Sequence, residues 1–330
     1  MPDAGEGVDL KAIVRPIILA QGNKYIKELL RENNIKIGAT KADFEENLFG
    51  AIDDGGLTQA MVEAWLLKVE GWGDQHVYML SAPKAAFAAL EAGIRKSPYA
   101  GLLDVPVGYD FPDELALTAV RLSHDALSID WHKGSGAWER AKLKDYQQEL
   151  EGDTYEFRAY RGRSDRTVVR FEWQFAKPYC GLFTQLPNDG ETHPRALARV
   201  FEDLKALGVV EGPLAKVSLS QAVKAATQDA AVIAHSTKML TEGGYVDLVA
   251  TVDGGGIGDV AAIRRVRQGV DDKDFGTAEG VLSFTTEKHP GLSRTVKASI
   301  YGSDGRFRVW VQCKREDVYA VADLIWRRNG

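Results

Sequence analysis

The periodicity of the apolar residues changes near residue 112, and this change constrains the fold more than any other feature of the chain. Before it, apolar side chains recur at helical spacing, as between Thr58 and Val69. After it, short runs rich in β-branched and aromatic residues alternate with polar ones, which is typical of strands. The sequence therefore predicts an α+β protein: a helical N-terminal domain followed by one or more antiparallel β-sheet-rich domains with covering helices.

The predicted elements divide the chain into three parts. A chain of 330 residues is long enough for two separate cores, because single cores stop growing near about 250–300 residues. Residues 1–97 are the predicted helical domain, although 74–81 fits either a short strand or a further helical turn. A Gly/Pro-rich linker leads to a first β-rich domain at 113–212 and a second β-rich section at 213–330, which is either separate or continuous with the first.

Within the two β-rich parts the individual elements can be placed from the pattern. Strands are expected at 115–123, 126–132, 155–160, 167–176, 180–185, 232–240, 245–252, 280–287, 295–302 and 307–313. Covering helices are expected after His193-Pro194, near Ser220, and from Val318 to Trp326.

Composition limits the possible partners and compartments. The formal net charge is −6, so any nucleic-acid contact must come from local basic patches. Two cysteines, Cys180 and Cys313, are too few for a disulfide framework or a structural zinc site, which favours a reducing compartment. The first residues lack the pattern of a signal peptide, and no apolar run approaches the roughly 18 residues of a membrane span. We expect a cytoplasmic (nucleoid-associated) or nuclear protein that is not secreted and does not contact a membrane.

Residues 23–52 predict two helices joined by a short extended segment. Gly38 supplies backbone freedom for the turn, and Thr40 is placed to cap the second helix with Asp43 three residues further on. The apolar stripes of the two helices are formed by Tyr25, Ile26, Leu29 and Leu30, and by Phe44, Leu48, Phe49 and Ile52. Residues 22–41 carry five basic and two acidic side chains, whereas residues 42–75 carry one basic and eight acidic ones. The basic half suits phosphates, and the acidic half suits either a solvated back face or a protein partner.

This stretch resembles a SAP motif, a small helix–extended loop–helix module that binds duplex DNA. The resemblance covers about a tenth of the chain and is carried by Leu29, Leu30, Gly38, Thr40, Lys41, Phe44, Leu48 and Ile52. It implies sequence-nonspecific binding of duplex DNA, with phosphates received at the start of the second helix. The DNA-binding residues that it suggests are Lys24, Lys27, Arg31, Lys36, Gly38, Thr40 and Lys41. The alternative is an ordinary helical hairpin with a solvated basic face.

A second basic segment lies between residues 158 and 170, which contain five arginines and one aspartate. It is interpreted as a hairpin whose arginines alternate with aromatic side chains, a combination that suits phosphate contact and stacking on bases. Its candidate DNA-binding residues are Arg158, Arg161, Arg163 and Arg166. The alternative is an exposed hairpin whose arginines pair with nearby carboxylates.

At the scale of the whole chain, a helical N-terminal domain leading into a β-rich body resembles centromere protein N. The similar segment is residues 60–80. The resemblance implies a non-enzymatic protein that binds DNA and works through a protein partner; a homo-oligomer is the other possibility.

The search for catalytic chemistry is largely negative. Gly256, Gly258 and Ala261 fit a loose dinucleotide fingerprint, but no βαβ unit precedes them. Asp165 and Glu172 suggest the acidic pair of a nuclease, yet Gln174 stands where that pattern has lysine. We therefore predict no cofactor, no metal and no catalytic residue, and a non-catalytic DNA-binding or adaptor protein. The alternative is a nucleic-acid-processing, nuclease-like enzyme with an unrecognised active site.

Overall fold

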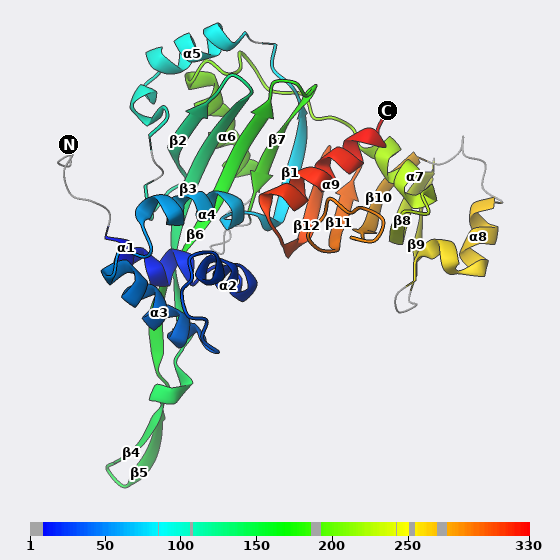
Figure 1. The fold of residues 1–330 in the computed structure, drawn as a ribbon. Helices are drawn as coiled ribbons and strands as arrows, with labels where there is room; N and C mark the ends of the chain where they lie inside the picture. Colours follow the sequence, from blue (N-terminus) through cyan, green and yellow to red (C-terminus); the bar gives the residue numbers. More distant parts are fainter. Residues whose placement is uncertain are drawn as a thin grey trace.

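The computed structural model describes residues 9–84, 86–105, 108–185, 193–241, 243–250, 255–268 and 276–330. It confirms the predicted α+β class: helices over residues 10–69 precede a large antiparallel sheet that helices cover (Figure 1). The N-terminal helices are α1 (Leu10–Ile13), η1 (Val14–Ile18), α2 (Asn23–Glu32), α3 (Lys41–Asp53) and α4 (Gln59–Val69). They share an apolar core of their own, in which the predicted stripe of α2 is buried together with Phe44 and Leu48 of α3, while Phe49 and Ile52 are partly buried against it.

Ten strands form one sheet, in the order β2-β3-β6-β7-β1-β12-β11-β10-β8-β9, and every pairing between neighbours is antiparallel. The strands are β1 (Gly73–Ser81), β2 (Ala116–Leu122), β3 (Ala126–Arg140), β6 (Tyr160–Gln174), β7 (Tyr179–Thr184), β8 (Val232–Thr241), β9 (Gly244–Val249), β10 (Gly276–Phe284), β11 (Val296–Tyr301) and β12 (Arg306–Gln312). The remaining short elements are η2 (Ala100–Leu102), η3 (Lys142–Lys144), η4 (Ile257–Asp259) and α8 (Ala261–Gln268).

Of the two interpretations left open for residues 74–81, the structure has the strand, β1. This strand lies in the centre of the sheet, between β7 and β12. The turn that leads into it needs glycine, because Gly71 and Gly73 both have φ of +76°. A Cβ on Gly73 would also lie 2.3 Å from the carbonyl oxygen of Val311 on the neighbouring strand. The predicted helical unit at 1–97 thus contributes a strand to the sheet of the β-rich body.

The two faces of the sheet are covered by different helices. Helices α5 (Phe87–Lys96) and α6 (His193–Ala206) pack on one face, and α7 (Ser220–Gln228) and α9 (Arg315–Arg327) pack on the other. In β1, Tyr78 and Leu80 belong to the core of the α5/α6 face, whereas Val77 and Met79 belong to the core of the α7/α9 face. This alternation follows from the two-residue period of a strand.

The sheet has two halves of similar construction on either side of β1. The first half-sheet comprises β2, β3, β6 and β7, preceded by α5 and followed by α6. The second half-sheet comprises β8, β10, β11 and β12, preceded by α7 and followed by α9, and β9 is inserted between β8 and β10 and flanks β8 at the outer edge. The four main strands of each half are antiparallel neighbours in chain order, and β1 pairs with the last strand of each half, so the two half-sheets are continuous.

The predicted arginine hairpin is wrong in its boundaries. Residues 160–174 form the single long strand β6, which pairs with β3 without a register shift. The hairpin at this point is instead formed by β4 (Tyr146–Leu150) and β5 (Asp153–Phe157), inserted between β3 and β6. Together with the distal parts of β3 and β6, this hairpin projects from the body as an arm (Figure 1). The sequence pattern missed this because the strand continues through a segment rich in charge.

Candidate functional site

The turn before α3 has the predicted local structure. Thr40 Oγ1 accepts from the backbone N–H of Asp43, while the Asp43 carboxylate accepts from the N–H groups of Ala39 and Thr40 at 2.7 and 2.9 Å. This capping box is the predicted cap. The N–H groups of Thr40 and Ala39, aided by Lys36, lower the pKa of Asp43. A carboxylate therefore already occupies part of the helix N-terminus at which a phosphate is expected.

Gly38 and Thr40 serve the turn itself. A Cβ on Gly38 would lie 2.0 Å from the Cβ of Asp43, so glycine is required by close approach, and Gly38 is not among the glycines with positive φ. The predicted reason, backbone freedom, is therefore replaced by a steric one. Thr40 supplies the cap.

The basic residues of α2 lie on the surface of the helix pair. Lys24, Lys27 and Arg31 recur at helical spacing, so they lie along one side of α2. Lys24 and Arg31 are exposed, and Lys27 is half-buried with its Nζ 5.9 Å from the centre of the Phe44 ring. Lys36 is exposed in the connecting segment.

Two predicted residues from distant parts of the chain meet in one groove. The groove has a volume of about 670 Å³ and lies between η1, α3 and β6. Lys41 lines it from α3 and Arg161 from β6. Arg15 and Glu45, which form an ion pair, also line it, and Lys41 Nζ donates to the Leu19 carbonyl oxygen at 2.7 Å. Three basic side chains and one carboxylate leave this basic groove with a formal charge of +2.

The other predicted arginines are placed differently. Arg158 is exposed on the arm and pairs with Glu156 at 3.3 Å, and the side chain of Arg163 lies outside the described residues. Arg166 is buried: its side chain is 2 % exposed, and its guanidinium donates to both carboxylate oxygens of Glu70 at 2.8 Å and to the Gly108 carbonyl oxygen at 2.8 Å. This bidentate pair joins the end of α4 to β6. Arg166 therefore connects the helical part to the sheet.

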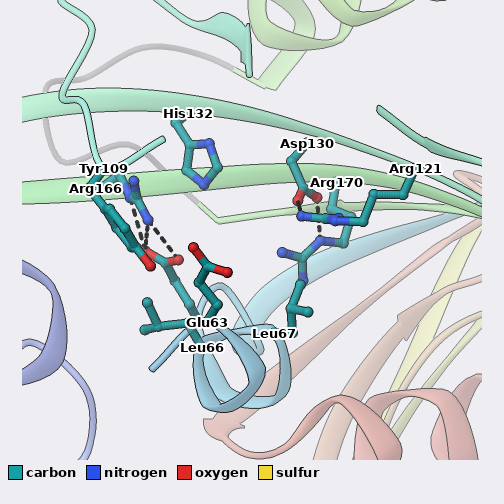
Figure 2. Close-up of a pocket in the computed structure, with 10 residues that line it drawn as sticks. Glu63, Leu66, Leu67, Tyr109, Arg121, Asp130, His132, Arg166 and Arg170 are labelled. Atoms are coloured by element: carbon teal, nitrogen blue, oxygen red, sulfur yellow. Dashed lines mark hydrogen bonds and ion pairs between the residues drawn. The ribbon is translucent and has the colours of Figure 1, made fainter. Parts of the chain in front are cut away.

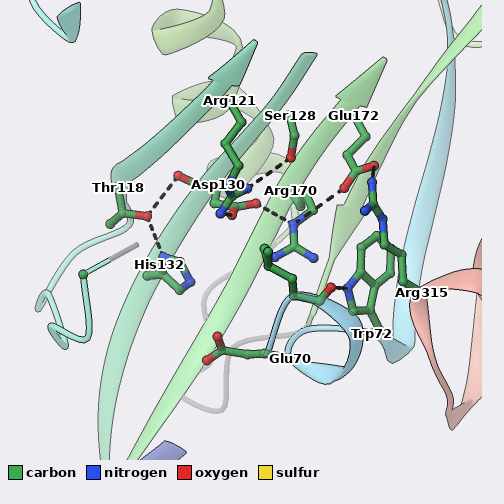
Figure 3. A network of polar contacts seen from close by, with 12 residues as sticks. Glu70, Trp72, Thr118, Arg121, Ser128, Asp130, His132, Arg170, Glu172 and Arg315 are labelled. Atoms are coloured by element: carbon green, nitrogen blue, oxygen red, sulfur yellow. Dashed lines mark hydrogen bonds and ion pairs between the residues drawn. The ribbon is translucent and has the colours of Figure 1, made fainter. Parts of the chain in front are cut away.

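A separate buried polar network lies on the α7/α9 face of the first half-sheet (Figure 3). Asp130 on β3 is fully buried and accepts from Arg170 Nε on one oxygen and from Arg121 on the other, at 2.8 Å. Burial opposes ionisation of Asp130, but Arg170 and Arg121 together hold its pKa well below the ordinary value. Next to it, Glu172 accepts from Arg315 at 2.8 Å, and burial raises the pKa of Glu172 against the opposing effect of Arg170.

Between this network and α4 lies a partly open polar cavity of about 100 Å³ (Figure 2). Charged, aromatic and apolar side chains line it: Glu63, Leu66, Leu67, Glu70, Tyr109, Arg121, Asp130, His132, Arg166 and Arg170. Burial, together with the positive charge of Arg166, lowers the pKa of His132 to about 4. Sequence reasoning missed this cavity; the available signal was the alternation of charged residues with apolar ones in β6, as in Arg170, Phe171 and Glu172.

The predicted nuclease pair does not form. Asp165 and Glu172 are seven residues apart on one regular strand, so their side chains point to opposite faces of the sheet. Glu172 is occupied by Arg315. In the part of the chain that the structure describes, no three His, Cys, Asp or Glu side chains are grouped to hold a metal ion.

Of the glycine-rich stretch before residue 261, residues 251–254 lie outside the described residues, and the described part, from residue 255, is not flanked by parallel strands. Residues 257–259 are a short 3₁₀ helix whose start is capped by Asp259, which accepts from the Gly256 N–H at 2.8 Å. The neighbouring β8 and β9 are antiparallel.

No protein-family model matches the chain, and no curated protein sequence matches it. The resemblances to a SAP motif and to centromere protein N thus stay predictions. None of the described helices combines the length and the apolar character needed to span a membrane.

Proposed function

We propose that this protein binds duplex DNA through the sugar-phosphate backbone, without reading sequence and without cleaving the strand. The observation that carries the proposal is the basic groove, in which Lys41 and Arg161, 120 positions apart in the sequence, line the same surface. A local formal charge of +2 in a chain with net charge −6 concentrates positive potential at this place. Phosphate contacts of this kind position a duplex but carry no sequence information.

Side chains, rather than the helix N-terminus, make the proposed contacts. Because the Asp43 carboxylate caps α3, a phosphate there would meet a negative charge. We assign the contacts to Lys41 and Arg161 in the groove, with Lys36 and the basic side of α2 extending the surface. Arg166 takes no part, since it is buried against Glu70.

We further propose that the protein acts as an adaptor, with the projecting arm contacting another protein chain. Trp138 is 76 % exposed, and Tyr146, Tyr155 and Tyr160 are each about half exposed on the same projection. Exposed aromatic side chains of this kind favour contact with a protein, either a partner or a second copy of this chain. Sedimentation velocity of the wild type and of Trp138→Ala, with and without duplex, distinguishes a different protein partner from a second copy of this chain. If the wild type is a monomer under all conditions, self-association through the arm is excluded.

Fluorescence anisotropy with a labelled duplex of random sequence tests the DNA contact. We expect the affinity to fall steeply with salt, with a slope of about −0.9 per phosphate contact. The variant Arg161→Glu with Lys36→Glu should weaken binding at least tenfold and make the slope shallower. Lys288→Glu, an exposed lysine in the second half of the chain, is the matched control. If the groove variant binds as tightly as the control, the proposal is wrong.

A further inference from the structure

The polar cavity contains hydrogen-bond donors that the protein's own network leaves unused. Arg170 donates from Nε to Asp130, and its guanidinium carbon lies 4.7 Å from the centre of the Trp72 ring. Within the described residues, neither Nη1 nor Nη2 of Arg170 has a hydrogen-bond partner, although the side chain is only 7 % exposed. The Nη atoms are not sealed in the core, so they can donate to a molecule that enters the cavity. This arginine lines the cavity.

An unused acceptor faces the same space. The Thr118 hydroxyl lies 3.1 Å from the Asp130 carbonyl oxygen and 2.5 Å from Nδ1 of His132. We assign its proton to the carbonyl oxygen, so that the hydroxyl accepts from Nδ1–H of His132. That tautomer leaves Nε2 of His132 as an acceptor, and Nε2 has no partner among the described residues. The lowered pKa, about 4, keeps the ring neutral above pH 5. Figure 2 shows the His132 ring and the Arg170 guanidinium entering the cavity from neighbouring strands, opposite Glu63 of α4.

The remaining features define the ligand. The hydroxyl of Tyr109, whose pKa is raised by burial and by the nearby Glu63 carboxylate, has no partner at full hydrogen-bond geometry in the described part of the chain. The volume of about 100 Å³ equals about three waters at ~30 Å³ each, enough for one compact group. Three arginines and three carboxylates line the cavity, so its formal charge is zero with His132 neutral, which favours a monoanion over a dianion. The ligand must offer oxygens to Arg170 and Tyr109 and a proton to His132.

We propose that the polar cavity binds a phosphate group that retains a proton, either free phosphate or the terminal phosphate of a larger molecule. Its ionised oxygens accept from Arg170, and its P–OH donates to His132 Nε2. Sulfate has no proton at the same pH, and neither has the diester phosphate of a nucleic-acid backbone. The site is therefore chemically distinct from the phosphate contacts of the basic groove, and it does not depend on them.

Isothermal titration calorimetry of the whole chain at pH 6.0 tests this. Inorganic phosphate and sulfate are titrated at matched ionic strength. We expect phosphate to bind at least tenfold more tightly than sulfate. Equal binding of the two ions, or no binding of phosphate, would overturn the proposal, the second outcome showing that the cavity holds water alone.

Substitutions place the binding in this cavity. Arg170→Lys keeps a positive charge beside Asp130 but removes the Nη donors, and should weaken phosphate binding at least tenfold. His132→Asn keeps a polar group at the Nδ1 position and removes Nε2, so phosphate binding should be weak. His132→Gln keeps an acceptor at the Nε2 position, so phosphate binding should be partly retained.

Arg315→Lys, outside the cavity lining, is the matched control. If Arg170→Lys does not fold, Tyr109→Phe removes one hydroxyl from a half-buried side chain and should still weaken binding. Wild-type binding in the variants would overturn the proposal.

The source of the phosphate is settled by competition. A 5′-phosphorylated trinucleotide that displaces phosphate, when the 5′-hydroxyl form does not, identifies a terminal phosphate. Failure of both to displace it identifies the free ion. Arg161→Glu should bind phosphate like the wild type, so loss of DNA binding and loss of this site can be told apart.

Discussion

The two half-sheets share a topology but differ in what they bury on the α7/α9 face. In the second half-sheet this face is apolar, with Leu282, Phe284, Val296, Ala298, Ile300, Phe307 and Val309 packed beneath α7 and α9. The same face of the first half-sheet carries Asp130, His132, Arg170 and Glu172, all buried. The difference teaches that the strands of this architecture can present either an apolar or a charged surface to the same layer of helices.

Buried ion pairs are weak evidence for stability, since desolvation offsets most of the attraction. The buried pairs of the first half-sheet are therefore not evidence that it is more stable than the second, and the proposed phosphate site would give them another role. The comparison also separates the two proposed sites: the basic groove lies at the surface of the helical part, whereas the polar cavity lies where that part meets the sheet.

The largest expected effect is that of Asp130→Ala. It leaves Arg170 and Arg121 without their carboxylate, and removing one partner of a buried pair costs about 3–5 kcal/mol. Urea unfolding followed by circular dichroism measures the change. In the second half-sheet, Ser283→Ala removes a buried hydroxyl on the opposite face of β10, bonded to His235, and should cost only about 1 kcal/mol. Equal losses in the two variants would contradict the contrast between the halves.

The next effect concerns pH. The pKa of His132 is about 4 in the folded protein, against 6.5 when unperturbed. The unfolded chain thus binds the extra proton between pH 6.5 and 4, and stability falls as pH falls through this window. The loss attributable to His132 is about 3 kcal/mol between pH 7 and pH 4. Urea unfolding of the wild type and of His132→Asn across this range should show the wild type losing more; parallel curves would refute the assignment.

A double substitution should make the first half-sheet resemble the second. In Asp130→Leu with Arg170→Met, apolar side chains replace the buried pair, an exchange that is often neutral or stabilising by about 1–4 kcal/mol. We expect the free energy of unfolding to return to within about 1 kcal/mol of the wild type, with phosphate binding lost. Stability as low as that of Asp130→Ala would show that the network is needed for folding.

The smallest effect is expected at the surface of the second half-sheet. Lys238 Nζ lies 4.0 Å from Glu279 Oε1, and both side chains are partly exposed. Such pairs contribute about 0–1 kcal/mol because solvent screens them. Lys238→Ala should therefore shift the urea midpoint only slightly, and a shift as large as that of Asp130→Ala would remove the distinction between buried and exposed charge.

Local features of this fold are predictable from the sequence, and long-range ones are not. The capping box of Thr40 and Asp43, the helix that follows Thr58 and most strands of the sheet follow from patterns within a few residues. The pairing of Arg166 with Glu70 joins residues 96 positions apart, so the local run of arginines cannot distinguish a buried clamp from an exposed hairpin. The cavity likewise needs α4, β2, β3 and β6 to be brought together.

The position of β1 has a consequence for biosynthesis. This strand is made early, yet one of its edges pairs with Arg306–Val309 and Gln312, some 230 residues later, and the other with Tyr179–Thr184. While the second half of the chain is still being synthesised, this apolar strand has an unpaired edge, and unpaired strand edges promote aggregation. Pairing of β1 with β12 is also expected to be slow, because contacts between residues far apart in the sequence delay folding. A nascent chain of this protein should thus depend on chaperone protection until β12 has emerged.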